Sequence, residues 1–144
     1  MANFSITTTT KKSPEEVCAY LADMTNAASW DPGVVAARRL DEGELKVGSQ
    51  FEVGLKAAGQ SFTLTYTLVE YEPPNHLVLS SENAFIISRD TVTIALDDEG
   101  ATSVTYSAEL NGKGVASVLE PLWKYAITTL GNHAASGFLE QFGA

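Results

Sequence analysis

The sequence of 144 residues has few cysteines, histidines and basic residues. Cys18 is the only cysteine, which excludes an internal disulfide and fits a reducing cytoplasm. His76 and His133 are the only histidines, which argues against a multi-histidine metal site. The sequence also has no phosphate loop, no dinucleotide fingerprint and no HExxH or CxxC pattern. We therefore expect no metal and no cofactor.

The charge balance argues against nucleic-acid and membrane partners. Nine Lys and Arg residues stand against 18 Asp and Glu residues, which gives a formal net charge of −9. Phosphate backbones and anionic membranes both attract clustered positive charge, and adjacent basic pairs occur only at Lys11-Lys12 and Arg38-Arg39. No apolar run approaches the roughly 20 residues that span a bilayer, and the first residues do not resemble a secretion signal. We predict no nucleic-acid partner, no stable membrane insertion and a cytoplasmic location.

Alternating apolar and polar residues predict an antiparallel sheet. A β-branched segment at 3–10 reads as the first strand, and further alternating segments follow at 34–40, 51–55, 62–68, 77–81, 86–96 and 104–110. After the first strand, Ser13-Pro14-Glu15-Glu16 is typical of a helix start, and a second short helix is expected over 25–30. The pattern thus predicts about seven strands in meander order, with two short helices after the first strand.

The C-terminal segment 115–144 has the pattern of one long helix. Pro121 leaves two alternatives open: the regular helix begins near Glu120, or it bends at the proline. His133 falls inside its apolar stripe, which otherwise comprises Val115, Leu119, Leu122, Trp123, Ala126, Leu130, Ala134 and Gly137. The stripe mixes large and small side chains, which would leave room for a ligand. We expect a single domain, 1–144, in which a curved sheet wraps this helix around an internal cavity.

Five short motifs in a fixed order carry a resemblance to a known family. They are Ser13-Pro14-Glu15-Glu16-Val17, Asp23 through Trp30-Asp31-Pro32, Gly48-Ser49-Gln50-Phe51, Val69-Glu70-Tyr71-Glu72-Pro73-Pro74, and Thr102-Ser103-Val104-Thr105-Tyr106. In this order, across essentially the whole chain, they resemble the START-like superfamily. It is also called SRPBCC, or the polyketide cyclase/dehydrase and lipid-transport group. The resemblance implies an α+β helix-grip fold. Similar members include aromatic polyketide cyclases, plant ligand-binding proteins, lipid carriers and many bacterial proteins.

His133 and Asp90 are the candidate catalytic residues. His133 on the inward helix stripe is a ligand hydrogen-bonder or general base, or else an ordinary core histidine. Asp90 and Ser88 share a strand face with residues expected inward, Val92, Ile94 and Leu96. A carboxylate there requires a charged partner or a shift toward its neutral form, and the alternative is a solvated strand end. Alternation places Arg89 on the opposite face and predicts that Glu70 faces inward.

Five residues are candidates for ligand binding: Trp30, Phe51, Tyr66, Tyr106 and Leu130. The phenols of Tyr66 and Tyr106 can each reach a ligand oxygen, with core packing as the alternative. Trp30 either gates the cavity or plugs a corner of it. Phe51 lies on an alternating strand, and Leu130 lies on the helix stripe.

Two functions are compatible with this pattern. The first is binding or transport of a hydrophobic small molecule, such as a polyketide, a lipid or an isoprenoid-like compound. The second is an aromatic polyketide cyclase or dehydratase that uses the same cavity. We favour binding because the sequence contains no clearly recognisable set of catalytic residues. The sequence leaves the natural ligand open, and it leaves the choice between monomer and homodimer open as well.

Overall fold

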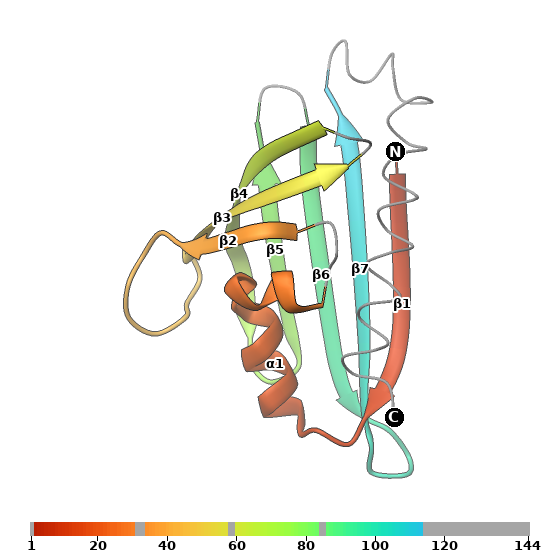
Figure 1. Cartoon of the computed structure of the whole chain (residues 1–144). Coiled ribbons are helices and arrows are strands. Elements are labelled where there is room, and N and C mark those ends of the chain that lie inside the picture. The colour runs from red at the N-terminus through yellow and green to blue at the C-terminus, as the bar shows by residue number, and fades with distance from the viewer. Residues whose placement is uncertain (1, 31–33, 58–59, 84–85, 114–144) are drawn as a thin grey trace.

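The computed structural model describes residues 2–30, 34–57, 60–83 and 86–113. Within them a single curled antiparallel sheet of seven strands is accompanied by two short helices (Figure 1). In chain order the elements are β1 (Ala2–Thr10), α1 (Pro14–Ala22), the 3-10 helix η1 (Met24–Ser29), β2 (Val34–Arg39), β3 (Gln50–Ala57), β4 (Gln60–Glu72), β5 (His76–Glu82), β6 (Ile86–Leu96) and β7 (Thr102–Gly112). These elements confirm the predicted sheet and short helices. The helix expected over 115–144 lies outside the described residues.

The strand order departs from a simple meander at one point. Strands β2 to β7 follow one another across the sheet, but β1 pairs with β7 at the opposite edge from β2. The reason is that α1 and η1 carry the chain across the sheet before β2 begins. Helix α1 contacts β5 and β6, and η1 contacts β2. We call the face on which α1 packs the inner face (Figure 1).

Local sequence signals account for α1. The Ser13 hydroxyl accepts a hydrogen bond from the Glu16 backbone N–H at 3.2 Å, and the Glu16 carboxylate accepts one from the Ser13 N–H at 3.4 Å. Pro14 takes the first helical position, where its missing N–H costs nothing. Val17 and Leu21 are buried on the side that meets the sheet. The predicted helix start is therefore confirmed.

Strand β6 shows the predicted alternation over most of its length. Ser88, Asp90, Val92 and Ile94 are all buried, whereas Arg89 between them is exposed. The prediction for Leu96 is wrong, because this residue is 64% exposed. Leu96 is the last residue of β6 and lies at the hairpin turn, where the strand leaves the packed core.

A bulge in β4 explains why Glu70 does not face inward as predicted. Tyr66 and Leu68 are buried, but the pairing of β4 with β5 shifts between Leu68 and Glu70. The extra residue moves the alternation by one position, so Glu70 faces outward. Its carboxylate accepts a hydrogen bond from Arg89 at 2.6 Å and lies 3.1 Å from His76 Nε2. These two partners hold the pKa of Glu70 below its usual range.

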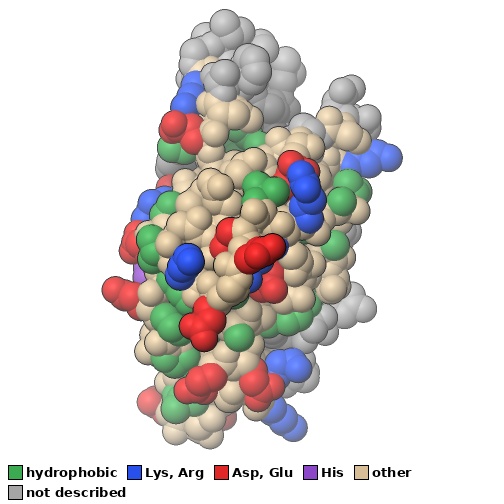
Figure 2. Space-filling view, turned by 90° about the vertical axis from the view of Figure 1, so that its left-hand side faces the viewer, with side chains coloured by type: hydrophobic (Ala, Val, Ile, Leu, Met, Phe, Trp, Pro, Cys, Tyr) green, Lys and Arg blue, Asp and Glu red, His purple; other side chains and the backbone are tan. Residues whose placement is uncertain are grey.

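The side of the molecule that carries the loop between β2 and β3 shows no extended patch of one charge among the described side chains. Acidic and basic side chains lie among apolar ones on this face (Figure 2). Arg38 pairs with Glu52 across β2 and β3 at 3.0 Å, and Arg39 pairs with Asp41 at 3.0 Å. Opposite charges therefore neutralise each other locally along this edge.

Candidate functional site

The inner face of the sheet carries a group of polar side chains inside the apolar core. Tyr66 comes from β4, Ser88 and Asp90 from β6, and Tyr106 from β7. Their exposed fractions are 7%, 4%, 6% and 6% respectively. We call these residues the polar row. Because Asp90 is buried, its alternative interpretation as a solvated strand end is wrong.

Hydrogen bonds link the polar row from end to end. The Tyr106 hydroxyl donates to Asp90 Oδ2 at 2.6 Å, a length typical of a hydroxyl bonded to a carboxylate. Ser88 Oγ donates to Asp90 Oδ1 over a longer distance of 3.5 Å. The Tyr66 hydroxyl lies 3.3 Å from Ser88 Oγ. Asp90 is therefore the acceptor toward which Tyr106 and Ser88 point.

Strand register brings Asp90 and Tyr106 together. Asp90 pairs with Ala108 on β7, and Tyr106 pairs with Val92 on β6. The two residues are thus diagonal neighbours on one face, a spacing that a long aromatic side chain can span. The small side chain of Ala108 directly opposite Asp90 leaves the carboxylate accessible to the phenol.

The same register explains how Tyr66 reaches a strand that is not its neighbour. Tyr66 on β4 is aligned with Ser81 on β5, since the adjacent residues Thr67 and Ser80 pair. Ser81 in turn pairs with Ser88 on β6. Ser81 is buried and small, so the phenol of Tyr66 can cross β5 above it.

Trp30 packs at the other end of the polar row. It caps η1, is 8% exposed, and meets the ring of Tyr106 edge to face, with 5.3 Å between ring centroids and 69° between ring planes. This geometry is favoured for aromatic pairs. Trp30 therefore packs against the ring whose hydroxyl is bonded to Asp90. A gating role for Trp30 stays a prediction.

The structure describes only one of the three remaining candidate residues. Phe51 is fully buried and pairs with Tyr66 through the β3–β4 ladder, so it forms part of the apolar wall beside the polar row. His133 and Leu130 lie outside the described residues. The prediction that His133 approaches Asp90 therefore stays a prediction.

A second polar cluster, which the sequence did not indicate, closes the loop between β2 and β3. Asp41 accepts hydrogen bonds from the Arg39 guanidinium, the Ser49 hydroxyl and the Gln50 backbone N–H, with shortest distances of 3.0 Å. The hydrogen bond from Arg39, followed by that from Gln50, holds the pKa of Asp41 far below its usual range. We assign this cluster to loop structure because every partner of Asp41 belongs to the loop or its flanking strands.

Among the residues that the structure describes, no group of three or more His, Cys, Asp and Glu side chains is arranged to hold a metal ion. No described helix has the length and apolar character needed to cross a membrane.

Comparison with known proteins identifies the family. A family model described as polyketide cyclase/dehydrase and lipid transport matches residues 1–135. The chain belongs to this family. The resemblance seen in the sequence motifs is thereby confirmed. A search of curated proteins found no significant match.

Several solved structures have a fold similar to that of this chain. A START superfamily protein from Mycobacterium smegmatis is 14% identical, with a TM-score of 0.75, covering 99% of this chain and 97% of its own. The Zhui aromatase/cyclase from a Streptomyces species is 13% identical, with a TM-score of 0.76 and coverages of 96% and 92%. Ginseng major latex-like protein 151 from Panax ginseng is 16% identical, with a TM-score of 0.59 and coverages of 92% and 97%. At such low identities these similarities establish the fold alone.

Proposed function

We propose that this protein, as a single domain, binds or carries a hydrophobic small molecule against the inner face of its sheet. The observation that carries the proposal is the polar row. A buried carboxylate is costly unless it is hydrogen-bonded, and an apolar core has no need of one. Small-molecule sites, by contrast, combine an apolar wall with a few convergent polar groups that orient the ligand. Tyr66, Ser88, Asp90 and Tyr106 match that description.

The side chains around the polar row support the same interpretation. Ala108 lies opposite Asp90, and Ser81 lies opposite Ser88. Small residues beside the polar groups favour the approach of a guest molecule. Phe51 and Leu68, both fully buried, supply apolar surface next to Tyr66. A polyketide, a lipid or an isoprenoid-like compound has the matching character, and the family description includes lipid transport.

A titration with a neutral apolar fluorophore, N-phenylnaphthylamine, tests the proposal. We expect saturable binding to the wild type, and an affinity about tenfold weaker in Ala108→Leu, because added side-chain volume beside Asp90 competes with the guest. Ala95→Leu is the matched control, since Ala95 is exposed on the same sheet. Absence of saturable binding, or equal effects of the two variants, would contradict the proposal. Native mass spectrometry of protein from its own host would identify the molecule carried.

A polyketide cyclase or dehydratase activity is the second candidate function. It is favoured by the short Tyr106–Asp90 hydrogen bond, because a phenol beside a carboxylate can move a proton to or from a reacting oxygen. The Zhui aromatase/cyclase has a similar fold. We prefer binding because it requires only the apolar face and the polar row. The reaction would also require His133 as a base.

Turnover of a poly-β-ketone substrate separates the two functions. We expect no cyclised product above the uncatalysed background, and we expect His133→Ala to keep its affinity for the fluorophore within a few-fold. Loss of turnover in His133→Ala with binding retained would reverse our preference.

A further inference from the structure

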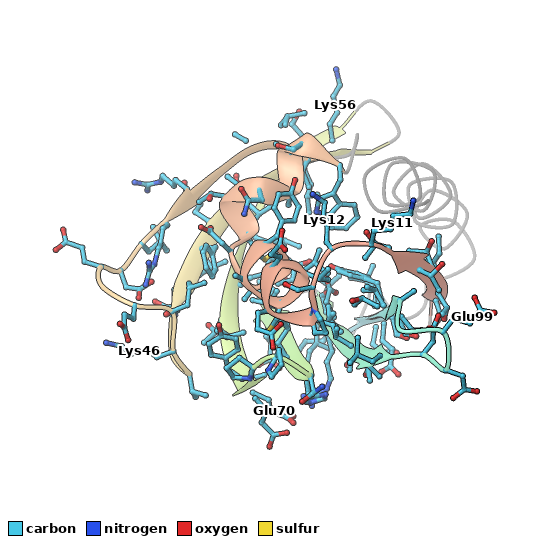
Figure 3. The ribbon with its side chains drawn as sticks, turned by 90° about the horizontal axis from the view of Figure 1, so that it is seen from below. Lys11, Lys12, Lys46, Lys56, Glu70 and Glu99 are labelled. Carbon is cyan, nitrogen blue, oxygen red and sulfur yellow. The ribbon has the colours of Figure 1, made fainter. Side chains whose placement is uncertain are left out.

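Ser81 on β5 lies on the inner face of the sheet, between two members of the polar row. Its ladder partner on β6 is Ser88, and on β4 it is aligned with Tyr66. The outer face is marked by Glu70, which Figure 3 shows directed outward and which pairs with Val78 on β5. Alternation along β5 places Ser81 on the opposite side from Val78. A molecule that occupies the polar row would therefore lie against Ser81.

The hydroxyl of Ser81 differs from the other buried polar groups in its hydrogen bonding. Ser81 is only 3% exposed. Within the described ranges, every other buried polar side chain takes part in a hydrogen bond: Thr10, Ser49, Ser88, Asp90 and Thr102. In the same ranges, no group forms a hydrogen bond with Ser81 Oγ. The Ser81 hydroxyl is therefore a buried polar group whose bonding capacity is unused.

The Ser81 oxygen also borders open space. In the part of the chain that the structure describes, no fully shielded side-chain nitrogen or oxygen lacks a hydrogen-bond partner. Because Ser81 Oγ has no described partner, it is not fully shielded, and it contributes to the small exposure of the residue. A buried hydroxyl without a partner costs free energy, so packing alone would favour an apolar residue such as alanine at this position. A partner supplied by a bound molecule accounts for the serine.

We propose that Ser81 anchors the bound molecule through a hydrogen bond to a neutral ketone or hydroxyl oxygen on an otherwise apolar ligand. This inference rests on the proposed binding function, and it names the anchoring residue and the ligand group that it recognises. A serine hydroxyl has one proton to donate and two lone pairs that accept, so it can bond to either kind of oxygen. Leu79 and its partner Leu68, both buried, supply apolar surface beside Ser81 for the rest of the ligand. A pure hydrocarbon would leave the hydroxyl unbonded.

A pair of ligands that differ by one carbonyl group tests the anchor. 1-Tetralone and tetralin share a fused-ring skeleton, and the affinity of each is measured by displacement of N-phenylnaphthylamine. The ratio of the two affinities is compared between the wild type and Ser81→Ala, so that the difference in hydration of the two ligands cancels. We expect the ratio to fall about tenfold in Ser81→Ala, because the ketone loses its donor while tetralin binds as before.

Ser80→Ala is the matched control on the same strand. Ser80 lies on the outer face, where its hydroxyl donates to the backbone carbonyl of Ser88 at 3.1 Å. We expect Ser80→Ala to leave the affinity ratio unchanged. We also expect the urea midpoint of Ser81→Ala to equal or exceed that of the wild type, because the substitution removes no hydrogen bond within the described structure. A lowered midpoint would assign the hydroxyl to the fold and contradict the inference.

The outcomes distinguish this inference from the proposed function. If the fluorophore binds but Ser81→Ala keeps the wild-type ratio, the inference is wrong while the binding function stands. An equal fall of the ratio in Ser81→Ala and Ser80→Ala also contradicts it. If the fluorophore does not bind to the wild type at all, the proposed function fails and takes the inference with it.

Discussion

The Tyr106–Asp90 hydrogen bond should be the most stabilising link in the polar row. Tyr106→Phe removes only the hydroxyl, so the ring keeps its edge-to-face contact with Trp30. The lost bond is short, at 2.6 Å, and both partners are buried. Removal leaves a buried carboxylate without one of its donors. Since hydrogen bonds to charged groups contribute about 1.5–3 kcal/mol, we expect a loss of about 2 kcal/mol in the free energy of unfolding.

Tyr66→Phe provides the matched control. It removes a hydroxyl of the same kind from the same row, but that hydroxyl lies 3.3 Å from a neutral serine. We expect a loss of about 1 kcal/mol or less. Urea unfolding followed by circular dichroism yields both values, provided that the denaturant slopes are unchanged. An unaltered stability of Tyr106→Phe, or a larger loss in Tyr66→Phe, would refute this reasoning.

Three further predictions concern the rest of the fold. Asp41 has a lowered pKa in the folded protein, so its stabilising contribution is full above its unfolded pKa of about 3.9 and is lost as the pH falls through the folded value. Below about pH 4 the urea midpoint of the wild type should therefore fall more steeply than that of Asp41→Asn. Parallel pH profiles of the two proteins would argue against this reasoning. Glu42→Gln is the control variant from the same loop. Ser13→Ala should cost about 1 kcal/mol by urea unfolding, because it removes the cap of α1, and no loss would contradict the capping argument. The thiol of Cys18, which is buried and has a raised pKa, should react with a disulfide reagent about tenfold or more slowly in the native protein than in urea, and equal rates would show that the thiol is accessible.

Features that depend on local sequence could be predicted. The start of α1 follows from Ser13 and Glu16, which lie within one helical turn of each other. The inward positions of Asp90 and Val92 follow from alternation along a regular strand. Both patterns are determined by neighbours close in the chain, so no knowledge of the tertiary structure was needed.

Features that depend on pairing between distant segments could not be predicted. The outward position of Glu70 results from a bulge that exists only in the pairing of β4 with β5. The hydrogen bond from Tyr106 to Asp90 depends on register, which places these residues of two different strands beside each other. Trp30 meets Tyr106 only because η1 folds back over the sheet. Strand alternation indicates a face, but it does not reveal which polar residues on that face find partners.

Backbone amide chemical shifts during a titration with decanol test the central claim most directly. If a ligand occupies the inner face at the polar row, the largest saturable changes should occur at Tyr66, Ser88, Asp90 and Tyr106, with small changes at outward-facing Glu70 and Arg89. Saturable changes confined to the outer face, or none at any ligand concentration, would contradict the account.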